Sequence, residues 1–381
     1  MADWLGSRSN TRLHHAVGLA TLVLVILTRW WIYITADVAL GDEFIYLQAF
    51  RAVANGADPG QVGGFYYPPT FAALGGWLVQ TVGELGTQAI LRISSVLGLV
   101  ITVWISACLW QAPWSWRVAV SSLFVLVSPA VAYGFAAGNI SFVVTGTILL
   151  ALAAWSYYPI TSGVLLGTST AIKPLAPLAI LALVSHRPVP ESRQQILAGC
   201  LGGTLALAFL SSDLGYLTTK SAAVGRLPFI RSISLNRILV LLGIELSPVL
   251  IAAILGLLVA LTARLWPMNR RTMLCFGGVA AVLAVPIIWS HTLLLTLPLQ
   301  VLALSLAMTR KREHPTLHPA QRKYEWIFVV LAVAALQLTE GAGAIDDRAL
   351  AFQLVILTGA YLAAPALMAY VLAVEQKTRR L

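Results

Sequence analysis

Residues 14–36 read HHAVGLATLVLVILTRWWIYITA. Arg29 is the one Lys, Arg, Asp or Glu in this stretch, and a helix needs about 20 mostly apolar residues to cross the hydrocarbon core of a bilayer. The run exceeds the apolar region of a signal peptide, which is about 7–15 residues long, and no small-residue cleavage site follows it. The stretch therefore predicts a retained first membrane-spanning helix.

Similar apolar runs fill the rest of the chain. Of its 381 residues, 59% are hydrophobic and 10% are charged, and the mean hydropathy is +0.83, whereas about a quarter of the residues of a soluble protein are charged. The net charge of +10 comes from short clusters of Lys and Arg, not from the continuous basic stripe of a nucleic-acid-binding protein. We therefore expect an all-α, polytopic membrane protein with a single domain, residues 1–381, and no nucleic-acid partner.

Polar, proline and glycine breaks divide the chain into about twelve predicted spans. These are residues 14–36, 67–83, 88–110, 117–136, 139–158, 160–184, 195–212, 238–263, 273–290, 292–309, 324–340 and 350–374. The pieces around Pro129 and Gly138 read either as full spans or as short, broken helices.

Loops rich in Lys and Arg are retained on the cytoplasmic side of a membrane. Five such clusters, in residues 8–12, 185–194, 264–272, 310–323 and 377–380, fall on the same face when the chain crosses twelve times. Both termini are therefore predicted to be cytoplasmic. Residues 37–66 and 213–237 form the two long extracytoplasmic loops, and loops of that length in a compact domain are usually functional.

The first long loop, residues 37–66, contains a predicted interfacial helix. Apolar residues recur at helical spacing from Phe44 to Val53, and Asn55 and Gly56 follow as a stop signal. Asp42 stands at or just before the start of this helix, where it is either an N-cap or a functional carboxylate. Tyr66 and Tyr67 precede two prolines at the entry to the next run, either as membrane anchors or as substrate contacts.

Lys173 lies within the apolar run 160–184, directly before Pro174. An ammonium in that position costs about 2.5–3.5 kcal/mol on the insertion scale. It therefore faces a polar cavity or a partner, unless its stem snorkels to the surface. His291 begins an outer turn, where it is either a structural hydrogen-bonding residue or a ligand contact.

The second long loop, residues 213–237, carries four cations on the face where cations are disfavoured. Lys220, Arg226, Arg231 and Arg237 therefore suit phosphate binding, with contact to anionic lipid headgroups as the alternative. Asn236 and Arg237, at the start of the following span, are the pair expected to face inward.

Over roughly residues 37–300 the sequence resembles a known family. The residues that carry the resemblance are Asp42, Tyr46, Gly56-Ala57-Asp58-Pro59, Tyr66-Tyr67-Pro68-Pro69, Gly138-Asn139, Lys173-Pro174, Ser234-Leu235-Asn236 and Trp289-Ser290-His291. Their order and spacing resemble the multispanning C-superfamily (GT-C) glycosyltransferases that use polyprenyl-phosphate sugars, and within them the mannosyltransferase family that includes the actinobacterial phosphatidylinositol-mannoside mannosyltransferases. Two departures are Gly60, where the family often has Tyr, and Thr292, where it often has a second His.

The resemblance implies an inverting hexosyltransferase, by likeness an α-mannosyltransferase, acting at the extracytoplasmic face of the cell membrane. Its donor is a polyprenyl-phosphate sugar, and its acceptor is a hydroxyl of a glycolipid or lipoglycan of the cell envelope. Asp42 takes the role of the base, because a carboxylate is ionised at neutral pH.

The other residues have expected roles around the donor and acceptor. The groups expected to bind the donor phosphate or sugar are Lys173, His291, Arg226, Arg231, Asn236 and Arg237. The groups expected to position substrates are Tyr46, Tyr66, Tyr67 and Asn139. No metal or cofactor is expected, because fixed cations suffice to neutralise a monophosphate leaving group. The alternative function is a transporter or flippase for a lipid-linked or anionic substrate.

Overall fold

The computed structural model describes residues 9–36, 38–110, 113–186, 193–211, 235–244, 246–283, 290–313, 319–337 and 350–380. Within these ranges the elements are helices joined by turns and loops, and no strand is present. The prediction of an all-α protein is therefore confirmed.

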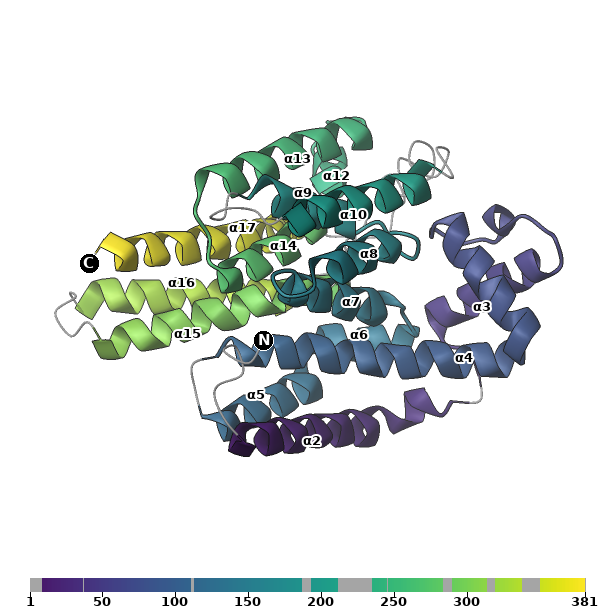
Figure 1. Ribbon diagram of the computed structural model, residues 1–381, viewed down its shortest axis with the longest axis horizontal. Coiled ribbons are helices and arrows are strands. Elements are labelled where there is room, and N and C mark those ends of the chain that lie inside the picture. The colour runs from purple at the N-terminus through teal and green to yellow at the C-terminus, as the bar shows by residue number, and fades with distance from the viewer. Residues whose placement is uncertain are drawn as a thin grey trace.

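The helices follow one another along the chain as a bundle (Figure 1). Their bounds are α2 (Ser9–Ile34), α3 (Gly41–Ala54), η1 (Pro59–Gln61), α4 (Pro69–Cys108), α5 (Trp114–Val127), α6 (Pro129–Ala137), α7 (Ser141–Ala154), α8 (Pro159–Ser169), α9 (Ala176–Ser185), α10 (Arg193–Ser211), α12 (Leu235–Leu241), α13 (Pro248–Leu265), α14 (Arg270–Leu283), η3 (Ser290–Thr296), α15 (Leu297–Glu313), α16 (Pro319–Gln337) and α17 (Leu350–Arg380).

Five helical segments in the described part of the chain are long and apolar enough to cross a membrane. They are Leu13–Ile34, Pro69–Cys108, Arg193–Ser211, Thr292–Thr309 and Thr358–Gln376. A sixth results if α5 and α6, which are bent by 55° at Ser128, are counted as one broken span. These helices are compatible with a membrane protein, while the count of about twelve crossings stays a prediction.

Element α4 (Pro69–Cys108) consists of two helices that meet at a kink at Gly83, where the sequence predicts the break between residues 67–83 and 88–110. Gly83 has φ 74° and ψ 175°, a conformation that residues with a Cβ rarely adopt. The glycine that the sequence pattern marks as the end of a span therefore separates two helices of different direction.

The single span predicted for residues 160–184 is wrong. Helix α8 ends at Ser169 and α9 begins at Ala176, so Lys173 and Pro174 lie in the turn between two helices. Proline provides no backbone N–H and restricts the residue before it, which explains why the helix stops here.

Helices α8 and α9 run in opposite directions. Tyr157, just before α8, accepts a hydrogen bond from Arg270 (2.7 Å), and His186, just after α9, lies 3.3 Å from the carbonyl oxygen of Ala263. Both contacts are at the connection between α13 and α14. The turn between α8 and α9 lies instead beside the first turn of α4, whose Thr70 hydroxyl donates to a turn carbonyl (2.7 Å). The turn is therefore held at the opposite end of the bundle from that connection.

Small residues allow the helices that carry the site to pack closely. Helices α4 and α7 cross at Gly98 and Gly146, and a Cβ added at Gly98 would lie 2.2 Å from the carbonyl oxygen of Phe142. Helices α8 and α10 meet in the same way at Gly163 and Gly202, where a Cβ on Gly163 would lie 2.2 Å from a backbone oxygen of α10. Such contacts are typical of helix packing in membranes, where small residues let backbones approach.

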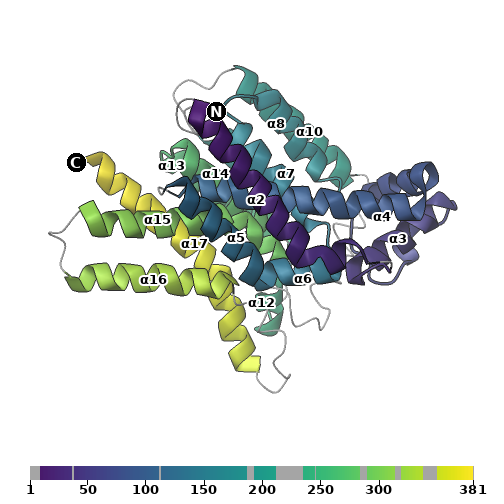
Figure 2. The ribbon, with the colours of Figure 1, turned by 90° about the horizontal axis from the view of Figure 1, so that it is seen from below.

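Helix α3 lies at one end of the molecule, and the C-terminal end of α15 and the start of α16 lie at the other, as Figures 1 and 2 both show. An aromatic cluster holds α3 against α4: Phe50 and Phe71 contact each other edge to face, with ring centroids 5.1 Å apart, and both are buried. Because Phe50 occupies the space beside Gly75, α3 docks closely on the first part of α4.

Candidate functional site

The first turn of α3 carries two adjacent carboxylates that face different partners. The N-cap of α3 is Leu40, so Asp42 and Glu43 both lie inside the first turn, where the exposed N–H groups and the helix dipole favour negative charge. Asp42 is therefore not an N-cap. Its Oδ2 accepts a hydrogen bond from the side-chain amide of Asn139, which belongs to the junction between α6 and α7.

The side-chain amide of Asn139 is oriented by a hydrogen bond from the start of α7. Gly138 ends α6 in the left-handed conformation, with φ 64°, and Asn139 follows it as a buried side chain. Its Oδ1 accepts a hydrogen bond from the backbone N–H of Ser141 at the start of α7 (2.8 Å). Because the carbonyl oxygen is used in this way, the NH₂ group is the end that faces Asp42.

Two tyrosines extend this group of polar contacts. The Tyr46 hydroxyl donates to the Tyr67 hydroxyl (2.6 Å), and Asn139 Nδ2 lies 3.3 Å from the same Tyr67 oxygen. The two rings meet edge to face, with centroids 4.9 Å apart. The structure therefore brings Asp42, Tyr46, Tyr67 and Asn139 together. The sequence left membrane anchoring and substrate contact open for Tyr67, and its hydroxyl lies in this polar group.

Lys173 lies in the same group from the turn between α8 and α9. Its side chain is 7% exposed, and Nζ donates to Ser141 Oγ (2.7 Å) and to Thr292 Oγ1 (3.4 Å). The ammonium also lies 5.9 Å from the centre of the Tyr67 ring, within the range of a cation–π contact. Both described acceptors are neutral hydroxyls, so the Lys173 charge is held without a carboxylate in direct contact.

We call this group the Asp42–Lys173 site; its members are Asp42, Tyr46, Tyr67, Asn139, Ser141, Lys173 and Thr292. Burial raises the pKa of Asp42 above its usual value, and the Asn139 hydrogen bond and the positive charge of Lys173 partly oppose that rise. Burial also raises the pKa of Tyr46 well above its ordinary value, as do neighbouring Tyr67 and Asp42. Tyr46 is therefore a neutral phenol, and Asp42 is the group in α3 suited to accept a proton.

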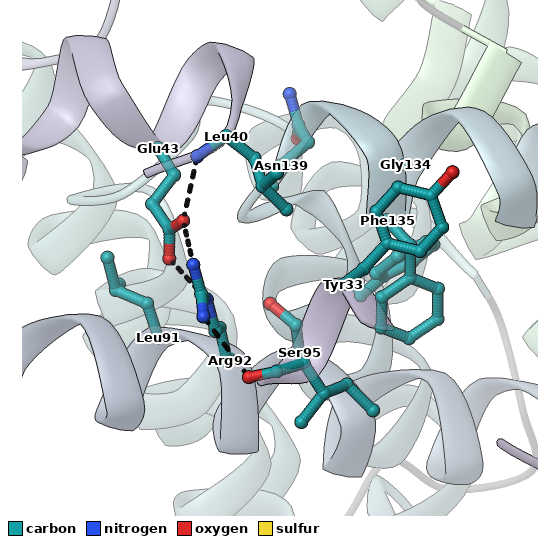
Figure 3. A pocket seen from close by; sticks show the side chains of 12 residues that line it. Tyr33, Leu40, Glu43, Leu91, Arg92, Ser95, Gly134, Phe135 and Asn139 are labelled. Carbon is teal, nitrogen blue, oxygen red and sulfur yellow. Dashed lines mark hydrogen bonds and ion pairs between the residues drawn. The ribbon is translucent and has the colours of Figure 1, made fainter. Parts of the chain in front are cut away.

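A second carboxylate, Glu43, faces away from this site and pairs with Arg92 of α4 (Figure 3). The contact is bidentate, with Nε–Oε1 at 3.0 Å and Nη2–Oε2 at 2.8 Å, and Gln88 Nε2 donates to Glu43 Oε2 (3.1 Å). Glu43 is 1% exposed. A pocket of about 320 Å³ lies beside the pair.

Arg92 also binds the segment that leads into α3. Its guanidinium donates to the carbonyl oxygens of Ile34 (3.2 Å), Ala36 (2.6 Å) and Val38 (3.0 Å). The segment after α2 and the first turn of α3 are therefore fastened to one side chain of α4. This fixes the position from which the neighbouring Asp42 reaches Asn139.

The structure describes the remaining predicted site residues only in part. Tyr66 is half-buried and precedes Tyr67 in the chain. His291, Asn236 and Arg237 lie in η3 and α12, but their side chains lie outside what the structure describes, as do Arg226 and Arg231 altogether. Because the next residue after His291, Thr292, contacts Lys173, the backbone at His291 is adjacent to the site.

Several members of the site were not predicted from the sequence. Ser141 was not singled out, and Thr292 was noted only as a departure from the family pattern. The Glu43–Arg92 pair was also missed, although a cation in the apolar run 88–110 signals a buried partner.

Comparison of the sequence and structure with known proteins gives no assignment: no family model matches, and neither a curated protein nor a solved structure matches. The chemistry of the site must therefore be inferred from its geometry. Among the described residues, no three His, Cys, Asp or Glu side chains come together as metal ligands would. The arrangement instead offers a half-buried carboxylate, a pair of tyrosine hydroxyls and a buried ammonium.

Proposed function

We propose that this protein is an inverting GT-C-like glycosyltransferase that moves a hexose from a polyprenyl-phosphate donor to a hydroxyl of a glycolipid or lipoglycan. By resemblance the hexose is mannose. The observation that carries the proposal is that a half-buried carboxylate, Asp42, and a buried ammonium, Lys173, are linked through two residues: Asp42 accepts from Asn139, Asn139 accepts from the Ser141 N–H, and Lys173 donates to the Ser141 hydroxyl. A transferase of this kind needs both a proton acceptor and a cation for the departing phosphate.

The reaction assigned to the site is a single displacement. The acceptor hydroxyl attacks the anomeric carbon from the face opposite the phosphate, and Asp42 takes the hydroxyl proton. The new carbon–oxygen bond forms as the bond between the anomeric carbon and the phosphate oxygen breaks. Polyprenyl phosphate leaves with that bond's electron pair, and the anomeric configuration is inverted.

Lys173 suits the role of stabilising the leaving phosphate. Fixed positive charge is most effective where water is excluded, and Lys173 is almost fully buried. Its two neutral acceptors, Ser141 and Thr292, orient the ammonium without cancelling its charge. In the proposed reaction the departing phosphate is the anion that pairs with the Lys173 ammonium.

The supporting groups hold the base in position. Asn139 donates to Asp42, and a hydrogen bond to a carboxylate favours its ionised form. Tyr46 and Tyr67 add a hydroxyl pair beside it, suited to contact with sugar or acceptor hydroxyls. Apolar helices would hold the polyprenyl tail in the membrane.

We infer a single membrane domain with about twelve crossings, both termini in the cytoplasm and the Asp42–Lys173 site on the extracytoplasmic side. The Asn269 side chain, just before α14, donates a hydrogen bond to Glu375 near the end of α17 (2.6 Å). This contact supports placing the start of α14 and the end of α17, both next to predicted cytoplasmic clusters, on the same side of the membrane. These ends and the connection from α13 lie on the side of the molecule away from α3 (Figure 1). Arg264, Arg270 and Arg271 belong to that side, in agreement with the retention of cations in the cytoplasm.

The test is a transfer assay with the purified full-length protein. Polyprenyl-phosphate mannose and a panel of membrane glycolipids would be supplied together, and products would be examined by mass spectrometry for the addition of one hexose. The proposal expects such a product with an α linkage if the donor is β-linked. Movement of the donor across a liposome membrane without hexose transfer would instead favour the transporter.

A further inference from the structure

A groove lies between α4, α5, α15 and α16. Its volume is about 560 Å³. Most of the side chains that line it are apolar, among them Val103, Phe124 and Val301. A polar ligand would therefore find few partners inside the groove, whereas a hydrocarbon chain would fit its walls.

The mouth of the groove is marked by Trp110 and Arg117, on either side of the connection between α4 and α5. This connection lies beside the beginning of α2, because the ring of His14 stacks on the ring of Trp114 with centroids 4.9 Å apart. Trp side chains favour the membrane–water interface. The mouth therefore lies at the level of the lipid headgroups, on the same side as the start of α2.

Gln300 of α15 and Gln337 of α16 also line the groove. Gln337 Nε2 donates to Gln300 Oε1 (2.8 Å), and Gln300 Nε2 donates to Thr296 Oγ1 (2.9 Å). These amides bind one another and Thr296, so they are already paired within the protein. Along α5 the groove extends from Arg117 to Phe124, a rise of about 10 Å at 1.5 Å per residue.

We propose that this groove binds one acyl chain of an anionic glycerophospholipid, with the lipid phosphate at Arg117. A guanidinium makes strong, often bidentate, contacts with phosphate, and here it lies beside a tryptophan at the entrance to an apolar groove. Charge at the mouth and hydrocarbon-compatible walls inside together match an anionic lipid. The proposal requires only that the protein lies in a membrane and does not depend on the transfer reaction.

Native mass spectrometry of the full-length protein in detergent tests this proposal. Phosphatidylglycerol and phosphatidylcholine with identical acyl chains would be added in separate titrations. We expect the wild-type protein to retain one phosphatidylglycerol about fivefold more tightly than phosphatidylcholine, the scale of one basic residue acting on an anionic lipid. Arg117→Gln should remove this preference. Arg264→Gln, which removes an exposed arginine of α13 outside the groove, should leave it intact.

A second variant tests the groove itself. Ala107 lines the groove, so Ala107→Phe should fill it and weaken binding of both lipids, whereas Leu123→Phe on the exposed face of α5 should bind both as the wild type does. Equal retention of phosphatidylglycerol by Arg117→Gln and wild type would overturn the proposal. So would equal binding by the two Phe variants, or displacement of the lipid by an equimolar polyprenyl phosphate.

Discussion

Asp42 and Lys173 stand at the two ends of one series of polar contacts. Asp42 accepts from the Asn139 side chain, Asn139 accepts from the Ser141 backbone, and the Ser141 hydroxyl accepts from Lys173. The two charged groups thereby share a scaffold, the start of α7, without a direct ion pair. In the proposed reaction, a substrate between them would meet a base and a cation whose relative position is set by the protein.

Asp42→Asn should reduce hexose transfer by about 10²–10⁴-fold, the usual contribution of a positioned base. The substitution keeps the size of the side chain and an oxygen that accepts from Asn139, so the protein should still fold. The transfer rate of the purified variant checks this. Asp58→Asn is the matched control, because Asp58 is an exposed acid of the same loop that binds the Gly60 N–H at η1 (2.8 Å). Near-normal transfer by Asp42→Asn would remove Asp42 from the role of base.

Lys173→Met should slow transfer by about 10²–10³-fold, the scale of losing one group that stabilises developing negative charge. It should not lower the melting temperature, because methionine fills the space of the stem and removes a buried charge that costs free energy. Transfer assays and thermal unfolding, measured on one preparation, check both parts. A loss of activity accompanied by a large loss of stability would mean that Lys173 acts mainly in the fold.

The pH dependence of transfer should follow the raised pKa of Asp42. A base works in its ionised form, so kcat/KM should fall as the pH drops through that pKa, at a higher pH than for an exposed aspartate. Asn139→Ala removes a hydrogen bond that lowers the pKa, and it should therefore move the acid limb to still higher pH. Profiles of kcat/KM between about pH 4 and 8 measure the shift. An acid limb at unchanged or lower pH in Asn139→Ala would contradict the assignment.

The same pKa has a consequence for stability. Because the carboxyl of Asp42 has a higher pKa in the folded chain than in the unfolded chain, its contribution to stability is fully present below the unfolded pKa and is lost as the pH rises through the folded pKa. At neutral pH, Asp42→Asn should therefore unfold at the same temperature as the wild type or at a higher one. Thermal unfolding at two pH values checks the sign, and a clear drop at neutral pH would refute it.

Glu43→Gln should destabilise the protein by about 3–5 kcal/mol, the cost of leaving a buried charge without its partner. Arg92 would keep its carbonyl contacts but lose the carboxylate, and transfer should fall with stability because the same arginine fastens the start of α3. The control is Glu84→Gln, in an exposed pair with Arg51, which should cost about 1 kcal/mol or less. Chemical unfolding in detergent compares the two. Equal, small effects would show that the Glu43–Arg92 pair does not hold α3.

Local patterns in the sequence predicted part of this structure. Helical spacing from Phe44 to Val53 and the stop at Asn55 and Gly56 predicted α3, which spans Gly41–Ala54 with Asn55 as its C-cap. The broken helix near Pro129 was one of two readings left open, and it occurs as α5 and α6. These features depend on neighbouring residues, which a sequence displays directly.

Features that depend on distant residues were not predictable in the same way. The run 160–184 has the length and composition of one span, and the reversal at Lys173 depends on contacts with α4, α7 and η3. Glu43 and Arg92 are 49 residues apart, and no local pattern links them. Lys173 was singled out by its charge within an apolar run, whereas Asn139 was singled out only through the family resemblance, since hydrophobic periodicity carries no information on which polar side chains meet.

The two hydroxyls that receive Lys173 have a consequence for biosynthesis. Ser141 precedes Lys173 by 32 residues, whereas Thr292 follows it by 119. The two contacts of the ammonium therefore cannot both form until residue 292 has been synthesised. If the chain enters a membrane as proposed, Lys173 does so before its second acceptor exists, and the final arrangement of this turn depends on the C-terminal third of the polypeptide.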